Sequence, residues 1–360
     1  MLHAIHALTS GGAQQLVVDL VSDPESGLRH RIVAARVPFP RHYPGLQSTV
    51  LDHPTVPEFR ALLRRSRAKV LHLAHYHHPT EVRVAAWYDA VGRAACLEGV
   101  PILQSNMTPG DPWIDPADPF GRKGPARSIV CCSDWSLRNS GLAGMDGAVI
   151  HPGTPLAWFD ARAEPRRSPS GSREGFRMGF AARLDGDKFG DSIATILIQA
   201  AAFEPSLSFA IAGDGGLRAG LEDRLRRAGI AERVEFRGRI AFEDLPAFYA
   251  SLDVAIAPMA ADTFGSGSVH AIASGTPVAG FAAAALPEIL VHPSAMAPAG
   301  DARALAERAV SILRDQALRD EVWTAQRRNA ERRFDLAVMR REYAARLRSL
   351  ASSGNRSTAP

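Results

Sequence analysis

The 360-residue sequence is poor in cysteine, which excludes a disulfide framework and a cysteine-rich zinc site. Cys131 and Cys132 are adjacent in the apolar run SIVCCS, and Cys96 stands alone. We expect all three to be small buried side chains of a cytoplasmic protein, because free thiols are typical of a reducing compartment.

Long hydrophobic runs are also missing. No stretch of 18 apolar residues occurs, so we expect no membrane span. The N-terminal MLHAIHALTSGG lacks a basic region followed by a long apolar core, so we expect no secretory signal. Peripheral membrane contact stays an alternative for FRALLRRSRAKV, whose arginines would face anionic lipid, beside the simpler interpretation of an ordinary surface helix.

Lysine is scarce, although the net charge is +4 and the pI is near 9.2. Lys69, Lys123 and Lys188 are the only lysines, so the positive charge is nearly all arginine. In the Arg-rich segment at 326–350, acids are interleaved at helical spacing, which indicates a solvated helix rather than a nucleic-acid arm. RNP-type aromatic clusters and zinc-finger spacings are missing, so we expect no nucleic-acid partner.

What the sequence has throughout is an alternation of strand-length apolar runs with helical patterns. The runs in the first half are HRIVAARV, KVLHLAH, VPILQS and SIVCCS, and those in the second half are FRMGFAARL, LSFAIAGDG, RVEFRGRI and DVAIAPM. Buried strands that alternate with helices predict an α/β protein with parallel sheets covered by helices on both faces.

The segment DARAEPRRSPSGSREG is rich in Pro, Ser, Gly and charge, which is typical of a linker. A helical pattern runs from about 302 to 350, and SSGNRSTAP follows it. We predict an N-terminal domain over 1–159, a linker over 160–175, a second domain over 176–335, a C-terminal helix over 336–350 with a return to the first domain as one option, and a disordered tail over 351–360. Open sheets bind ligands beyond the carboxyl ends of their strands, so a cleft between the domains is the expected site.

Four loops that follow second-half strands carry unusual chemistry. Arg183 and Lys188 lie five residues apart after the first strand, and the second strand ends in glycines around 213–216. Gly238 directly follows the third strand. The fourth loop is DTFGSGSVH, residues 262–270, in which glycines free the backbone to approach a ligand and the next helix presents its first amides. Each pattern alone is typical of a turn, and together they predict a phosphate site.

With these motifs in order, the sequence resembles the retaining glycosyltransferases of the GT-B fold, in the group called family 4 or glycosyl transferases group 1. The matching text is GFAARLDGDKFGD, AIAGDGGLRAGLED, VEFRGRIAFEDLPAFYASLDVAIAPM and DTFGSGSVHAIASGTPV with LPEIL, over roughly residues 176–345. The first half matches more loosely, through Gly11-Gly12, IVCCSDWS and VIHPGTPLAWF. The resemblance implies two Rossmann-like domains whose parallel sheets face each other across a cleft.

The resemblance also implies roles for single residues, in a site for a nucleoside-diphosphate sugar without cofactor or metal. A UDP-sugar is the expected donor. Arg183 and Lys188 match the basic pair that grips the diphosphate, and Asp262 matches the acid beside the donor sugar's hydroxyls, so these three are the expected catalytic residues. The other expected donor contacts are Gly11, Gly12, Gly213, Asp214, Gly238, Arg239, Ile240, Phe264, Gly265, Ser266, Gly267 and His270.

The sequence departs from the family pattern at both ends of the fourth loop, where the family has glutamate. Asp262 keeps the charge on a shorter side chain. His270 stands where the family holds the nucleotide ribose, and each imidazole nitrogen serves one hydroxyl whereas a carboxylate can accept from two. We therefore expect ribose binding that is weaker or differently shaped, with a packed core histidine as the alternative.

Met107 is the third departure, because it follows VPILQS where the family carries a histidine that contacts the donor sugar. Methionine donates no hydrogen bond. The alternative donor or acceptor contacts are His75, Asn106, Met107 itself, Thr108 and Trp113. The leading prediction is a metal-independent retaining glycosyltransferase that acts on an unidentified acceptor hydroxyl. A non-catalytic nucleotide-sugar-binding auxiliary protein and a GT-B nucleotide-sugar epimerase are the alternatives.

Overall fold

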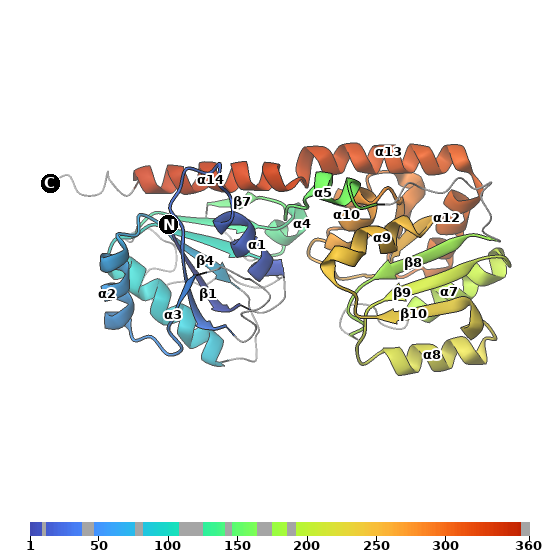
Figure 1. Ribbon diagram of the computed structural model, residues 1–360, viewed down its shortest axis with the longest axis horizontal. Coiled ribbons are helices and arrows are strands. Elements are labelled where there is room, and N and C mark those ends of the chain that lie inside the picture. Colours follow the sequence, from blue (N-terminus) through green and yellow to red (C-terminus); the bar gives the residue numbers. More distant parts are fainter. Residues whose placement is uncertain are drawn as a thin grey trace. The chain divides into compact units, whose positions relative to one another are not determined.

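The computed structural model describes residues 1–8, 12–37, 47–75, 82–107, 125–140, 146–163, 175–185 and 192–353. The chain divides into two compact units. Unit 1 combines Met1–Gly153 with Leu336–Pro360, and unit 2 is Thr154–Asp335. Figure 1 shows a sheet flanked by helices in each unit.

Unit 1 is built on a seven-stranded parallel sheet in the order β3-β2-β1-β4-β5-β6-β7. The strand order reverses between β1 and β4, which is the switch point of a doubly wound sheet. The strands are β1 (Leu2–Ala7), β2 (Arg31–Arg36), β3 (Ser48–Val50), β4 (Leu71–His75), β5 (Ile102–Asn106), β6 (Arg127–Cys131) and β7 (Gly147–Val149).

The period of two along each strand separates the two faces of this sheet. Leu2 and Ala4 of β1 pack in one apolar cluster with α2 (Val56–Ser66) and α3 (Val82–Leu97), whereas Ile5 packs in another with α1 (Gly12–Val21). Helix α2 begins in a capping box, in which Thr55 Oγ1 accepts from the Glu58 amide and the Glu58 carboxylate accepts from the Thr55 amide. The short α4 (Asp134–Arg138) follows β6.

The last helix, α14 (Leu336–Ser353), belongs to unit 1 and contacts α1 and β5 (Figure 1). Its side chains at Met339, Tyr343 and Leu347 pack in one apolar cluster with Leu103 of β5. Arg346 adds polar contacts, because its guanidinium donates to Ser128 Oγ and to the Asp146 carboxylate, each at 2.6 Å. The helix also includes Ala351, Ser352 and Ser353, which we expected in the tail, and residues 354–360 lie outside the described part.

Unit 2 repeats the topology with the strand order β10-β9-β8-β11-β12-β13, again parallel. Its switch point lies between β8 and β11. The strands are β8 (Arg177–Ala181), β9 (Ser208–Ala212), β10 (Val234–Gly238), β11 (Val254–Ala257), β12 (Val278–Phe281) and β13 (Met296–Ala297).

Helices cover this second sheet as the alternation predicted. Helix α12 packs on α7 and on β11 to β13, while α9 contacts β8 and α10 contacts β11 (Figure 1). The helices of unit 2 are α5 (Leu156–Asp160), α7 (Ser192–Phe203), α8 (Arg218–Arg227), α9 (Leu245–Ala250), α10 (Ser266–Ala273), α11 (Leu286–Leu290), α12 (Ala302–Arg314) and α13 (Gln316–Arg333), with 3₁₀ turns that include η3 (Phe242–Asp244).

The helical pattern over 302–350 is divided into three helices rather than one. Asp315 ends α12 and caps α13, because its side chain accepts from the Leu318 amide at 3.0 Å. At the second break the Phe334 carbonyl accepts from the Thr154 amide at 2.7 Å, and Asp335 pairs with Thr154. The backbone at this point therefore bonds to a distant segment instead of continuing the helix.

The prediction of two parallel α/β sheets is confirmed. In the part of the chain that the structure describes, no helix has both the length and the apolar character needed to cross a membrane.

Candidate functional site

Backbone hydrogen bonds join the loops that follow β8 and β9 of unit 2 to each other and to the last residue of β10. The Gly213 amide donates to the Gly238 carbonyl at 2.6 Å, and the Leu184 amide donates to the Asp214 carbonyl at 3.1 Å. The carboxyl ends of three neighbouring strands thus form one connected rim beside the switch point, where open sheets of this topology bind ligands.

Gly213 allows this close approach of backbone to backbone. Its φ is +140°, and a Cβ built on it would lie 1.8 Å from the carbonyl oxygen of Ala182. The neighbouring Asp214 supports the same loop, because its Oδ1 accepts from the Gly215 amide at 2.9 Å. The GDG pattern that we predicted as a ligand loop is therefore required by the packing of the rim, whatever it binds.

Arg183 extends from the loop after β8, the first side of the switch point. Its side chain is 64% exposed, and Nη1 lies 2.5 Å from Oδ2 of Asp185. An exposed pair of this kind is worth about 1 kcal/mol or less, so the guanidinium can exchange this partner for an anionic ligand at little cost. Lys188, the predicted companion of Arg183, lies outside the described residues.

Helix α10 begins on the other side of the switch point. Gly265 is its N-cap, with φ of +97°, and a Cβ there would lie 3.0 Å from Leu286 Cδ2. Glycine has no side chain with which to cap the first turn. In the described part of the chain no hydrogen bond is made by the amides of Ser266 and Gly267. This N-terminus is therefore an uncapped set of donors at the positive end of the helix dipole.

The first turn of α10 lies against the end of β8. A Cβ on Gly267 would be 3.2 Å from the Ala181 carbonyl oxygen and 3.2 Å from the Tyr249 hydroxyl. The uncapped amides therefore lie beside the end of β8, from which the loop that carries Arg183 continues, at the switch point of unit 2.

The segment that leads into α10 is held by a local hydrogen bond and by contacts with Ala285 and Phe334. Asp262, which is half-buried, accepts from the Phe264 amide at 3.3 Å through Oδ1, and its carbonyl accepts from Ala285 at 3.3 Å. Phe264 is 5% exposed and packs edge-to-face on Phe334, with ring centroids 5.3 Å apart. The side chain of Phe264, a predicted donor contact, is thus part of the core of unit 2.

His270 lies among aromatic rings that the sequence analysis did not single out. Its imidazole stacks on Phe159 at 5.0 Å between centroids and 16° between planes, and it meets Phe242 edge-on at 5.6 Å. Trp158 in turn stacks on Phe242 at 5.3 Å. Burial lowers the pKa of His270 to about 4, so the ring is neutral near pH 7. Two features of the sequence could have indicated these rings: the pair Trp158-Phe159 after VIHPGTPLA, and Phe242 after FRGRIA.

The other predicted rim residues lie after β10. Arg239, which is exposed, and Ile240, which is half-buried, follow Gly238 directly. They lead into η3, which carries Phe242, so this loop is continuous with the aromatic rings around His270.

In unit 1 the predicted contacts are placed at the carboxyl ends of β4 and β5. Gly12 starts α1, and a Cβ on it would lie 3.9 Å from Met107 Cε. Met107 follows β5 and packs against two apolar clusters, while Asn106 at the end of that strand is 1% exposed. His75 ends β4. Of the remaining predictions Gly11, Thr108 and Trp113 lie outside the described residues.

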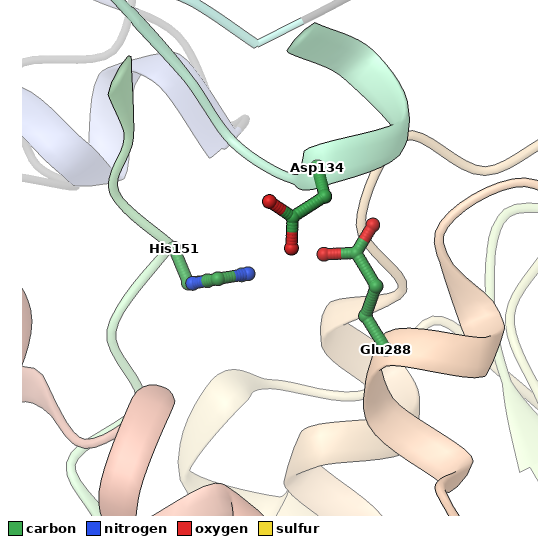
Figure 2. A group of neighbouring side chains, drawn as sticks. All are labelled: Asp134, His151 and Glu288. Atoms are coloured by element: carbon green, nitrogen blue, oxygen red, sulfur yellow. The ribbon is translucent and has the colours of Figure 1, made fainter. Parts of the chain in front are cut away.

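Unit 1 also contains an acid–histidine pair that the sequence analysis missed. A carboxylate oxygen of Asp134, at the start of α4, lies within 4.8 Å of a ring nitrogen of His151 (Figure 2). His151 follows β7 and is buried. Glu288, also drawn in Figure 2, is on α11 of unit 2, and its carboxylate lies 3.7 Å from Arg333. Two ligand groups are fewer than the three that a catalytic zinc takes from protein, so we assign no metal to the pair in unit 1.

Comparison with known proteins gives a match in the same unit. Residues 176–315 match the family described as glycosyl transferases group 1. The chain is 34% identical over 113 residues to 2-deoxystreptamine N-acetyl-D-glucosaminyltransferase of Streptomyces fradiae, which covers 31% of this chain and 27% of that protein. It is 32% identical over 142 residues to phosphatidyl-myo-inositol mannosyltransferase of Mycobacterium leprae, which covers 38% of each. The matches thus span roughly a third of the length of these relatives.

Solved structures resemble the chain over nearly its whole length. HepE from Anabaena in complex with UDP has a TM-score of 0.78 at 18% identity, covering 97% of this chain and 99% of that one. Sucrose-phosphate synthase from Thermosynechococcus elongatus has a TM-score of 0.71 at 18% identity, covering 98% and 99%. The predicted GT-B fold is confirmed.

Proposed function

We propose that this GT-B chain, which carries a glycosyl transferases group 1 region, is a glycosyltransferase that moves a sugar from a nucleoside-diphosphate sugar to an acceptor hydroxyl. The observation that carries the proposal is that the uncapped N-terminus of α10 lies against the end of β8, and the loop after β8 carries the exposed Arg183. The family match covers both elements. UDP is the expected nucleotide, because the structural neighbour HepE was solved with UDP.

The chemistry of sugar transfer explains why a site of this kind would serve. When the glycosidic bond breaks, negative charge grows on the departing diphosphate, and preorganised donors that meet this charge lower the barrier. Amides at the start of α10 and its dipole are fixed donors, and the guanidinium of Arg183 suits bidentate contact with phosphate oxygens. Lys188 adds a second cation in this proposal, on the basis of the resemblance alone.

We propose further that the transfer retains the anomeric configuration and that no metal is needed for the diphosphate. Support comes from the resemblance to family 4 and from the cations and amides named above, which supply positive charge without an ion. Asp262 would accept hydrogen bonds from donor-sugar hydroxyls. A cytoplasmic setting fits the three cysteines, none of which forms a disulfide.

A second function, nucleotide-sugar binding without transfer, is favoured by Met107. Its side chain packs in apolar clusters of unit 1 and donates no hydrogen bond to a sugar. The two functions differ in turnover and agree in nucleotide binding, so one set of measurements separates them.

The test combines nucleotide titration with a transfer assay on the intact chain. Calorimetric titration with UDP, GDP, ADP and dTDP identifies the nucleotide, and the matching sugar donors are then incubated with an acceptor panel. The first acceptors are 2-deoxystreptamine, phosphatidyl-myo-inositol and D-inositol 3-phosphate, because relatives are named for these compounds. New glycoside supports the transferase, binding without glycoside supports the second function, and the absence of binding to any nucleotide contradicts both.

A further inference from the structure

Among the described residues, helix α10 leaves one narrow face at least partly exposed. Ser268, Val269, Ala271 and Ile272 are buried on its other sides. Ser266 is exposed and Gly267 and His270 are half-buried. Spacings of three and four place His270 on the same face as Gly267 and Ser266. The imidazole therefore lies one turn, about 5.4 Å, along the helix from the uncapped amides.

The imidazole of His270 has ring contacts, but no hydrogen bond to it is found in the described part of the chain. Phe159 covers one side and Phe242 meets it edge-on. Within the described residues, neither ring nitrogen of His270 bonds to any protein group. A half-buried polar atom that lacks a hydrogen-bond partner costs free energy, and a ligand hydroxyl would reduce that cost.

The charged groups next to these rings are engaged elsewhere or point to solvent. The carboxylate of Asp160, adjacent to Phe159 in sequence, accepts two hydrogen bonds of 2.8 Å from Arg327. Glu243 and Asp244, which follow Phe242, are exposed. No carboxylate therefore stacks or bonds with His270 in the part of the chain that the structure describes.

Phe242 indicates which half of the donor lies here. Its side chain is 43% exposed, although it is a large apolar ring in contact with Trp158 and His270. An aromatic surface of this kind suits a planar base, whereas Asp262 suits the hydroxyls of the donated sugar. If the base lies on Phe242, the sugar ring next to His270 is the ribose of the nucleotide and not the donated sugar.

From this geometry we infer that the nucleoside half of the donor lies over Phe242 and His270, and that the site does not require the ribose 2′-hydroxyl. It accepts 2′-deoxyribonucleoside diphosphates and their sugars as well as the ribonucleotides. The inference rests on the proposed function. One imidazole nitrogen can hold the 3′-hydroxyl alone, whereas a carboxylate that bridges two hydroxyls loses a bond when one hydroxyl is missing.

The test is calorimetric titration of the full chain with UDP and with dUDP, which differ only at the 2′ position. Loss of one neutral hydrogen bond lowers affinity by about twofold to tenfold. The loss is smaller if the imidazole can bond to the 3′-hydroxyl when the 2′-hydroxyl is missing. We expect the two dissociation constants to agree within about threefold. A preference of tenfold or more for UDP would overturn the inference and leave the proposed function standing. No binding of either nucleotide would overturn both.

A substitution tests whether His270 is the cause. In His270→Glu the ratio of dUDP to UDP dissociation constants should rise to about tenfold or more, because a carboxylate accepts from both hydroxyls and charge-assisted bonds are roughly twice as strong. In His270→Gln, which stays neutral, the ratio should stay near that of the original chain. The matched control is His292→Gln, at a half-buried histidine paired with Glu321, where the ratio should not change.

The ratio compares two ligands on one protein, so partial unfolding of a variant lowers the bound amount for both and leaves the ratio readable. Melting curves with and without UDP report the folded fraction. An unchanged ratio in His270→Glu would show that the ribose does not contact this position, and would overturn the inference.

Discussion

The hydroxyl of Tyr343, on the last helix, lies 2.9 Å from Oγ of Ser105 on β5, although 238 residues separate them in sequence. From Ser105 a line of hydrogen bonds runs through the core of unit 1. Ser105 Oγ is 2.7 Å from His72 Nε2, His72 Nδ1 is 2.8 Å from His3 Nδ1, and His3 Nε2 is 2.8 Å from His30 Nδ1. His3 and His72 are fully buried register partners on neighbouring strands.

The bonds at the end of this line fix the direction of every proton in it. Ser26 Oγ donates to a backbone carbonyl at 3.0 Å, so it accepts from Nε2 of His30 at 3.2 Å. His30 Nδ1 then accepts from His3, whose Nδ1 accepts from His72. His72 Nε2 accepts from Ser105, which accepts from the tyrosine. Each histidine is neutral with one donor and one acceptor, so an added proton leaves two donors facing each other.

Stability is therefore expected to fall as the pH drops below the ordinary histidine pKa. Burial lowers the pKa of His72 to about 3 and lowers that of His3 well below its usual value, with neighbouring histidines adding to the effect on His3. Between about pH 6.5 and 3 the unfolded chain binds protons that the folded chain excludes, so the free energy of unfolding rises with pH there by about 1.4 kcal/mol per pH unit for each such histidine. Urea unfolding from pH 5 to 7.5 measures this slope.

The matched variants for the pH slope are His72→Gln and His53→Gln. A glutamine side chain does not titrate, so in His72→Gln the slope should fall even if the protein is less stable at every pH. His53 has a side chain that is 71% exposed, and its replacement should leave the slope unchanged. A slope that His72→Gln leaves intact would contradict the assignment of the acid sensitivity to this line.

Tyr343→Phe should destabilise the protein by about 1 kcal/mol, because one buried hydrogen bond is lost while the ring still fills its place. Tyr343→Ala should cost about 3 to 5 kcal/mol, since it also leaves a cavity in the cluster with Met339 and Leu347. Urea unfolding of both variants gives the two values. Equal losses would mean that the hydroxyl, rather than the packing of α14, dominates.

Arg183→Ala should lower kcat by about 10²-fold or more and weaken UDP binding much less, because the guanidinium meets charge that grows as the diphosphate leaves. Lys188→Ala is expected to behave in the same way. The control is Arg303→Ala, which removes an arginine of similar exposure that is paired with Glu307 on α12. Steady-state kinetics with the donor found by titration provide the measurement, and unchanged turnover in Arg183→Ala would remove the residue from the site.

Gly265→Ala should destabilise unit 2 by about 1 to 3 kcal/mol and weaken UDP binding, because alanine is strained at a positive φ and its Cβ meets Leu286 at 3.0 Å. Gly229→Ala is the control, since its φ is +71° but no atom lies within 4 Å of the added Cβ. It should show the backbone strain alone, with UDP binding intact. If both variants lost equal stability, the contact with Leu286 would have no measurable cost.

The loops of the proposed donor site could be picked out from the sequence because the features that mark them are local. Glycine is needed at 213 and at 265, where the backbone takes a positive φ, and Arg183 lies two residues after the end of β8. A parallel sheet places the ends of such strands at one edge, so separate loop motifs predicted one site. The capping box of Thr55 and Glu58 is local in the same sense, and α2 starts where those residues indicate.

The contact partners of individual side chains could not be predicted from the sequence. The sequence places Phe159 and Phe242 far from His270, and only the packing of α5, η3 and α10 brings their rings together. The break between α13 and α14 likewise depends on a hydrogen bond from Thr154.

Apolar periodicity along the chain determines which segments are strands and helices, because each element hides one face from water over a few residues. The prediction of two parallel α/β sheets was based on this periodicity. The order of the strands is settled by packing between segments distant in sequence. That order makes His3 and His72 neighbours, and the packing of α14 on unit 1 places Tyr343 beside Ser105. The buried histidines therefore form one line of hydrogen bonds only in the folded chain, and nothing in the sequence indicates it.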